Sequence, residues 1–414
     1  MGCTSSMYKN ARKKKKKNIP QVTIFVPPLR VPVLSDDVNK MLRGLVPKAL
    51  VDRISSLRNQ IAFVAQDTGG TAVQELQGAL EDYLPLIVGL TKRENGVQEL
   101  VEFKWKNIED GRHEVCAKDS WFELLSVVHM MATLTFSEAN SKLISKDPTS
   151  DRVVASDSMS AAVDLLLKAS GYLEFCIRDV LVHIPADIKR KMPKDLQEDV
   201  IGAISIQALA QGTEMQLGLA VESKKATLPV KRRLACEQLS YLGQAHFSLS
   251  KCINNGNENK QLLFIKWKYL EAKAAAYYYN GLIVDKGTNP SCHTTAVCCF
   301  LAAEELLTES KKACLNFCLA APITRTPPLW GAMKHLNKKI PETAFKKSQM
   351  YGYLLDQEKG LHGVPELPEF ELSLKPEEYE LPETNEAWDR EKWEIPGQTL
   401  KEHLIDSEDE MESD

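Results

Sequence analysis

The sequence predicts a mainly α-helical protein built as an elongated array of long helices. Helical periodicity runs through the middle of the chain, in segments near 120–146, 157–183, 194–223, 230–254, 259–284 and 295–321. Pro, Gly or Asn ends each of these segments, so the connections are short. The composition, 43% hydrophobic and 26% charged over 414 residues, is that of a folded globular chain. Long helices joined by short loops are typical of an α-solenoid or an elongated bundle.

The N-terminal part contributes extended chain and two further helices. Three prolines in "QVTIFVPPLRVPVL" (21–34) exclude a helix, so we expect this segment to lie extended against the body. Ser35, Asp36 and Asp37 then supply an N-cap and first-turn acids for one helix over 38–66. A second helix is expected over 72–93.

One β-hairpin is expected. Residues 100–107, "LVEFKWKN", alternate between apolar and polar and predict a strand. "EDGRH" (109–113) supplies the turn, and "EVCAK" (114–118) is a possible return strand. No other part of the sequence carries a credible hairpin signal.

The helices after this hairpin carry a packing signal of their own. "WKYLEAKAAAYYYNGL" (267–282) has the small-residue and aromatic spacing of tetratricopeptide-like helices. Its Ala side allows a neighbouring helix to approach, and Tyr277, Tyr278 and Tyr279 fill the gaps around it. No clean 34-residue period is present, so the likeness is one of packing only.

The composition of the chain changes in its C-terminal part, which becomes rich in Pro and Glu. From Pro327 onwards we expect extended chain, in which the Pro- and Glu-rich "VPELPEFELSLKPEEYELPE" (364–383) wraps back along the helices. Residues 396–414 form an acidic tail that contains Ser407, a candidate for phosphorylation. The predicted organisation is therefore a leader (1–18), one helical domain (19–395) and this tail.

The charge of the chain is distributed unevenly. Seven of the 52 Lys and Arg residues lie between Lys9 and Lys17, which leaves 45 against 56 Asp and Glu in the rest of the chain. An acidic body behind a basic leader points to a negatively charged partner surface near the N-terminus only. No apolar run is long enough to span a bilayer, and no secretory signal core follows the basic run. The ten cysteines are therefore expected to be reduced thiols.

The leader carries a lipidation pattern. Met1-Gly2-Cys3-Thr4-Ser5-Ser6 fits the N-myristoylation motif, in which the Gly2 amine is acylated. Cys3 is a natural palmitoyl acceptor once the chain touches a membrane. A single myristoyl chain binds only marginally, with a constant of about 10⁴ M⁻¹, so further contacts are needed for stable residence. The neighbouring cations would supply them by attraction to an anionic leaflet; they are Lys9, Arg12, Lys13, Lys14, Lys15, Lys16 and Lys17. We expect a peripheral, lipid-anchored protein rather than a membrane-spanning one.

The basic run has a second interpretation, as a nuclear-localisation or RNA-binding tail. It lacks interleaved aromatic residues and the body behind it is acidic, which favours the membrane over nucleic acid.

The sequence contains no catalytic motif. No phosphate-binding glycine loop, zinc-protease motif, nucleophile elbow or C-x-x-C pair is present. His129 lies in a strongly apolar helix and is interpreted as a satisfied core residue. One group of cysteines and a histidine lacks zinc-site spacing; it comprises Cys292, His293, Cys298, Cys299, Cys314 and Cys318. Cys314 and Cys318, one helical turn apart, are interpreted as small core hydrophobes. We expect no enzyme, no cofactor, no metal and no small-molecule substrate.

Four helical stretches resemble a known family, the BRO domain of ALIX-type endosomal adaptors. The stretches are "LKASGYLEF", "SIQALAQGTEM", "WKYLEAKAAAYYYNGL" and "AVCCFLAAEELL". The order of elements over residues 20–395 is also similar. The resemblance implies a boomerang-shaped helical domain that binds proteins. In one short lipid-bearing type of this family the lipid is on a C-terminal CaaX cysteine. Here the last four residues are Met-Glu-Ser-Asp, so Gly2 and Cys3 would serve instead.

The resemblance also implies a partner site. In the family, a hydrophobic patch on the concave face takes the amphipathic C-terminal helix of an ESCRT-III subunit of the charged multivesicular body protein type. Following the "LAQ" stretch, the patch falls on Leu217 (or Gln216), Val230 and Leu234. Val230 and Leu234 are spaced i, i+4 and share a helix face, although a buried seam has the same spacing. The family's acid–base pair beside the patch falls near Ser156 and Ser160, which departs from the pattern.

Together these observations predict a non-enzymatic adaptor for endosomal or multivesicular body sorting, or for membrane remodelling. It would sit on the cytoplasmic face of an endosomal or plasma membrane, with part of it in the cytosol. Two alternatives stay open: a lipid-anchored scaffold for another partner such as a small GTPase, and a basic-tailed nucleic-acid binder.

Overall fold

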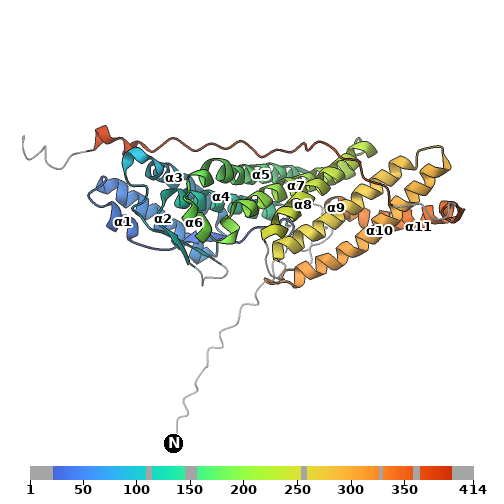
Figure 1. Cartoon of the computed structure of the whole chain (residues 1–414), viewed down its shortest axis with the longest axis horizontal. Helices are drawn as coiled ribbons and strands as arrows, with labels where there is room; N and C mark the ends of the chain where they lie inside the picture. The colour runs from blue at the N-terminus through green and yellow to red at the C-terminus, as the bar shows by residue number, and fades with distance from the viewer. Residues whose placement is uncertain are drawn as a thin grey trace, which may run out of the picture.

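A computed structural model describes residues 22–108, 114–144, 156–252, 259–325, 330–357 and 364–393. These residues form an elongated, mainly helical body (Figure 1). The helices are α1 (Asp37–Leu42), α2 (Lys48–Thr68), α3 (Val73–Thr91), α4 (Ser120–Leu143), α5 (Ser156–Phe175), α6 (Ala186–Lys191), α7 (Glu198–Glu222), α8 (Leu228–Cys252), α9 (Lys260–Val284), α10 (Pro290–Leu319) and α11 (Gly331–Gln357). The strands are β1 (Arg30–Pro32), β2 (Phe103–Asn107) and β3 (Glu114–Ala117).

The predicted hairpin is present as β2 and β3, and a third strand joins it. The strands form an antiparallel sheet in the order β1-β2-β3. Phe103 pairs with Ala117 in the hairpin, and Arg30 of β1 pairs with Asn107 on the other side. The prolines of the N-terminal segment correctly excluded a helix, but the three-residue strand β1 within this segment was not predicted. The predicted turn over 109–113 lies outside the described residues.

The single helix predicted over 38–66 is wrong, because two helices form instead. Gly44 adopts a positive φ of 80°, and Pro47 precedes the first residue of α2. Glycine tolerates this left-handed conformation, and proline at an N-terminal boundary loses no helical hydrogen bond. Asp36 stands at the N-cap of α1, but its side chain makes no capping hydrogen bond.

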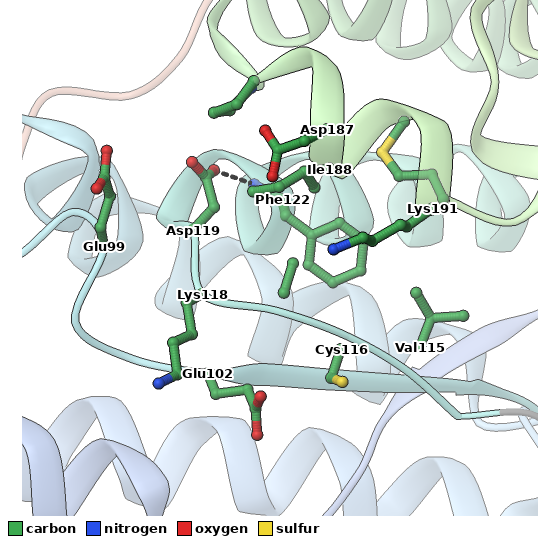
Figure 2. Close-up of a pocket in the computed structure, with 13 residues that line it drawn as sticks. Glu99, Glu102, Val115, Cys116, Lys118, Asp119, Phe122, Asp187, Ile188 and Lys191 are labelled. Atoms are coloured by element: carbon green, nitrogen blue, oxygen red, sulfur yellow. Dashed lines mark hydrogen bonds between the residues drawn. The ribbon is translucent and has the colours of Figure 1, made fainter.

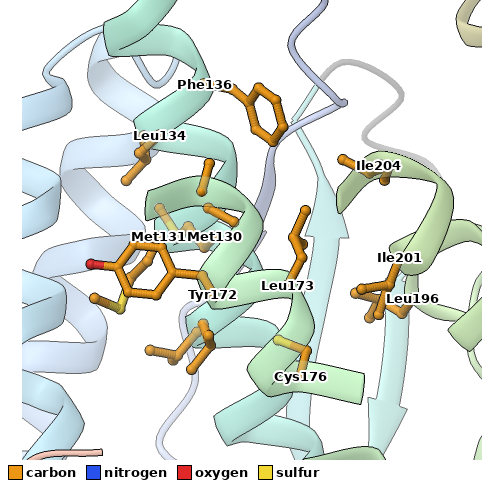
Figure 3. Close-up of a cluster of buried hydrophobic side chains, with 14 of the residues drawn as sticks. Met130, Met131, Leu134, Phe136, Tyr172, Leu173, Cys176, Leu196, Ile201 and Ile204 are labelled. Carbon is orange, nitrogen blue, oxygen red and sulfur yellow. The ribbon is translucent and has the colours of Figure 1, made fainter. Parts of the chain in front are cut away.

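The main core lies where α4, α5 and α7 meet. Met130 and Phe136 of α4, Leu173 of α5 and Ile201 and Ile204 of α7 are almost completely buried (Figure 3). Beyond this point α8, α9 and α10 each pack against the preceding helix, as Figure 1 shows. The predicted long helices with short connections are thus confirmed.

The small-residue stretch of α9 lets α10 approach closely. Ala274, Ala275 and Ala276 are buried, and Gly281 lies so close to Phe300 of α10 that a Cβ at this position would be 2.7 Å from its ring. The packing predicted for the tetratricopeptide-like segment is therefore present at the α9–α10 contact.

Helix α11 corrects the prediction of extended chain from Pro327 onwards. Leu336, Ile340 and Ala344 recur at helical spacing and are all buried against neighbouring helices. Pro341 lies inside α11 and removes one backbone donor there. Burial of this apolar stripe outweighs that loss, and the extended chain begins only after α11.

The predicted C-terminal wrap is present over residues 364–393, and it runs along one long edge of the body to α3 (Figure 1). The Glu377 backbone N–H donates to the Leu167 carbonyl of α5 at 3.0 Å. At the far end, Trp388 Nε1 donates to the Leu86 carbonyl of α3 at 2.9 Å. Gly171 provides the space in which the Glu377 backbone contacts α5. This segment, here named the strap, therefore ties the two ends of the body together.

A buried ionic network connects the sheet to three helices. Arg58 of α2 donates to Glu123 of α4 at 2.9 Å, and both side chains are almost completely buried. The other two guanidinium nitrogens donate to the carbonyls of Val33 and Lys104. Glu123 also accepts from the Tyr83 hydroxyl at 2.9 Å and from Trp105 Nε1 at 2.6 Å, and these side chains come from α3 and β2. Every charged atom of the network thus has a partner, as burial requires.

His129 of α4 is buried as predicted, but it is not a satisfied core residue. It is 1% exposed, and neither ring nitrogen has a hydrogen-bond partner within the described residues. Burial lowers its pKa from 6.5 to about 4; nearby Asp195 acts in the opposite direction and Arg30 adds to the lowering. The imidazole is therefore neutral at physiological pH.

Acidification should destabilise the protein through His129. Because its folded-state pKa lies below 6.5, the unfolded chain takes up the proton first, and stability present above pH 6.5 is lost on the way to pH 4. The loss should approach about 1.4 kcal/mol per pH unit in this window. Urea unfolding of wild type and His129→Leu should give a flatter pH profile for the variant. Exposed His183→Leu is the control, and an unchanged profile in His129→Leu would contradict the assignment.

Candidate functional site: a partner-helix groove

The predicted groove residues lie where α7 ends and α8 begins. Val230 is 46% exposed, whereas Leu217 is only 1% exposed. Leu234 is half-buried and packs on the same apolar cluster that contains Leu217. Leu217 therefore belongs to the core and forms the base of this region, so it cannot itself touch a partner. Its half-buried neighbour Gln216, the alternative position, is polar.

Side chains from α9 and the strap complete this surface. Leu367 and Phe370 of the strap pack against the same cluster as Leu234. Arg232 lies over the Phe370 ring at 5.7 Å, and its Nη1 donates to Asn280 Oδ1 at 3.2 Å. No local pattern in the sequence indicates that the strap borders this site, because the contact joins segments more than a hundred residues apart.

Basic residues flank Val230 in the sequence. Lys224 and Lys225 are exposed in the α7–α8 connection, and Lys231 is half-buried beside Val230. Arg233 is paired with buried Glu237 at 2.6 Å, and Glu237 also accepts from the strap at Ser373. Lys224, Lys225 and Lys231 thus form a basic rim on either side of Val230 along the chain, which would suit acidic residues on a partner helix. Exposed Glu366 and Glu369 of the strap flank Leu367 and Phe370 and add acidic groups to the same region.

Ser156 and Ser160, the positions of the family's acid–base pair, are exposed on α5. Ser156 Oγ donates to Asp157 at 3.3 Å and supplies no charge of its own. A charge-assisted partner contact at these two positions is therefore not available.

A separate cavity of about 550 Å³ lies between β3, the start of α4 and α6 (Figure 2). Asp119 Oδ1 accepts from the Phe122 backbone N–H at 2.9 Å and caps α4, while burial raises the pKa of this carboxyl. Lys118, which precedes α4, and Asp187 and Lys191 of α6 also line this cavity (Figure 2). The exposed thiol of Cys116 and the carboxylates of Glu99 and Glu102 also line this cavity.

The cysteine and histidine group does not form a metal site within the described ranges, where no set of three or more suitable ligands converges. His293 Nδ1 instead lies 3.1 Å from Asp285 Oδ1, and its ring stacks on Tyr351. Cys314 and Cys318 are buried in the core, and burial raises the pKa of Cys314 to about 12. A protonated thiol is a poor metal ligand.

The residues predicted to contact the membrane lie outside the described residues; they are Gly2, Cys3 and the seven basic residues between Lys9 and Lys17. Ser407, the phosphorylation candidate, lies outside them as well. In the part of the chain that the structure describes, no helix is both long enough and apolar enough to cross a bilayer.

The fold agrees with a family match. The model of the BRO1-like domain matches residues 47–346, which is most of the chain. The chain belongs to the BRO1-like domain family. This domain is generally a non-catalytic adaptor, in agreement with the absence of catalytic motifs in the sequence. Among curated proteins, none matches the chain by sequence.

Solved structures show the same fold at low sequence identity. ALIX bound to the SIVmac239 PYKEVTEDL late domain matches with a TM-score of 0.64 and 15% identity, over 91% of this chain and 52% of that one. The complex of the ALIX BRO1 domain with CHMP4C matches with a TM-score of 0.58 and 16% identity, over 91% and 99%. A Bro1 domain described in connection with endosomal targeting matches with a TM-score of 0.52 and 13% identity, over 82% and 99%. This BRO1-family chain thus spans about half of the longer ALIX chain.

Proposed function

We propose that this chain is a membrane-anchored, non-enzymatic adaptor that binds an amphipathic helix of an ESCRT-III subunit during endosomal sorting or membrane remodelling. The observation that carries the proposal is Val230, a large apolar residue left 46% exposed beside Leu234 on a BRO1 fold. A structural relative with this fold was solved with CHMP4C.

The proposed binding mode is a helix in a groove. Apolar anchors of the partner, spaced i, i+3 and i+4, would cover Val230 and Leu234. Acidic side chains of the partner would face Lys224, Lys225 and Lys231, which raises the association rate and fixes the orientation. Gln216 weakens the apolar patch, so the affinity should be modest.

Anchoring compensates for modest affinity. Acylation at Gly2, with Cys3 and the basic leader as secondary contacts, would hold the body at the cytoplasmic face of a membrane. Confinement of both partners to one surface raises their effective concentration, so a weak helix contact suffices.

A fluorescence titration of the full chain with a labelled C-terminal peptide of an ESCRT-III subunit tests the helix-binding half. We expect saturable binding with a Kd of about 100 μM or tighter. No binding at that concentration would favour a scaffold for another partner, such as a small GTPase. Retention on RNA with a steep salt dependence, unaffected by Gly2→Ala, would favour the nucleic-acid binder.

Preventing acylation of residue 2 should release the chain from membranes. In Gly2→Ala the amine remains, but the added methyl group breaks the glycine requirement of the myristoylation motif, so we expect a shift from the membrane fraction to the soluble fraction of cells by about tenfold or more. Mass spectrometry of the wild-type N-terminus should show the acyl group. Equal membrane fractions for both proteins, with an unmodified wild-type N-terminus, would contradict the anchoring half.

A further inference from the structure

The C-terminal end of α10 exposes an apolar surface that the helix-binding site does not use. Leu315, Leu319 and Ile323 are 55%, 65% and 60% exposed. Leu315 and Leu319 share one face of α10 because they are spaced i, i+4. We name these three residues the α10 tip.

The α10 tip is held in place by hydrogen bonds. The Thr324 backbone N–H donates to the Cys318 carbonyl at 3.1 Å, so the chain folds back against the last turn of α10 and carries Ile323 with it. Lys260 of α9 donates to the Ala320 carbonyl at 2.8 Å and also contacts the Pro322 carbonyl. The exposure of these side chains is therefore a property of an ordered surface.

The charge around the α10 tip is positive. Residues 310–325, "SKKACLNFCLAAPITR", contain three basic residues and no acidic one. Lys311, Lys312 and Arg325 are all exposed. This local charge is opposite to that of the body as a whole, in which acidic residues are in excess. Large aliphatic side chains ringed by cations are typical of a surface that contacts an anionic bilayer.

The leader joins the body beside this surface. Phe25, near the first described residue, packs on Phe317 of α10 with ring centroids 6.4 Å apart, and on Phe264 of α9 at 5.4 Å. Lys17 precedes Phe25 by eight residues, a span of roughly 28 Å at full extension. A bilayer that holds the basic leader is therefore within reach of the α10 tip.

We infer that the α10 tip is a second membrane contact, in which Leu315, Leu319 and Ile323 enter the interface of an anionic bilayer while Lys311, Lys312 and Arg325 face its headgroups. The inference rests on the membrane half of the proposed function and deepens it, because two contacts fix how the body is oriented on the bilayer. A leader alone would leave the body free to rotate.

The test uses the full chain without acylation and vesicles of phosphatidylcholine with about 30% phosphatidylserine. The double variant Leu319→Asp/Ile323→Asp should lower the vesicle partition constant at least about tenfold, because a buried aliphatic group is replaced by a charge that the anionic surface repels. Leu301→Asp is the matched control. Leu301 is on the same helix and 41% exposed, but it lies outside the α10 tip, so its variant should stay within about twofold of wild type. Hydrogen exchange should show vesicle-dependent protection of residues 315–325.

The outcomes separate the two membrane contacts. If the double variant partitions like wild type, or if it loses binding to the ESCRT-III peptide instead, the α10 tip is not a membrane contact. If Gly2→Ala leaves cellular membrane residence unchanged while the double variant still loses vesicle binding, the proposed acyl anchor is contradicted and the membrane contact of the α10 tip is supported. Retained peptide binding by the double variant shows that it is folded.

Discussion

Val230→Asp is expected to weaken binding of the ESCRT-III helix at least about thirtyfold. Covering an exposed valine with an apolar partner contributes roughly 1.5–3 kcal/mol, and the variant replaces that gain with the desolvation of a carboxylate. The new negative charge also opposes the acidic partner that the rim of Lys224, Lys225 and Lys231 favours. The measurement is the same peptide titration, with wild type and variant side by side.

The matched control is Val182→Asp. Val182 is 63% exposed, more than Val230, and lies in the turn after α5, away from the groove. The control variant should bind within about twofold of wild type. An equal loss of peptide affinity in both variants would mean that the effect comes from net charge. An unchanged affinity in Val230→Asp would show that the partner helix does not bind at Val230.

Arg58→Met is expected to lower the free energy of unfolding by about 3–5 kcal/mol. The substitution keeps most of the aliphatic volume but leaves Glu123 buried without its cation. The Val33 carbonyl loses the Arg58 donor as well, and the Lys104 carbonyl keeps only the Val33 backbone N–H at 2.9 Å. Urea unfolding monitored by circular dichroism gives the change directly.

Arg53→Met on the same helix is the control, because Arg53 is exposed and its variant should change stability by less than about 0.5 kcal/mol. The double variant Arg58→Met/Glu123→Leu should lose less than the sum of the two single variants, since it leaves no charge buried alone. A loss in Arg58→Met no larger than that in Arg53→Met would show that the ion pair does not stabilise the fold.

The sequence predicted most of the helical body because its signals are local. Long apolar periods ended by Pro, Gly or Asn are set within each segment. The errors came where a local signal was overruled. Gly44 and Pro47 divide a segment predicted to be one helix, and the change in composition from Pro327 onwards predicted extended chain although Leu336, Ile340 and Ala344 carry the helical period of α11.

The candidate site was predictable only in part. The i, i+4 pair of Val230 and Leu234 marks one helix face, but spacing cannot separate an exposed residue from a buried one, and Leu217 turned out to be core. The contacts of the strap with Arg232 and Glu237 join residues far apart in sequence, so no local sequence pattern predicts them. The network around Glu123 likewise depends on four elements meeting at one point.

Site-specific cross-linking tests the central claim most directly, namely that the surface between α7 and α8 receives the partner helix. Benzoylphenylalanine would replace Val230 in one full-length protein and Phe63, 64% exposed on α2, in another. On irradiation with the ESCRT-III peptide, we expect a cross-link from position 230 that unlabelled peptide competes away, and none from position 63. Cross-linking from position 63 alone, or equally from both positions, would contradict the account.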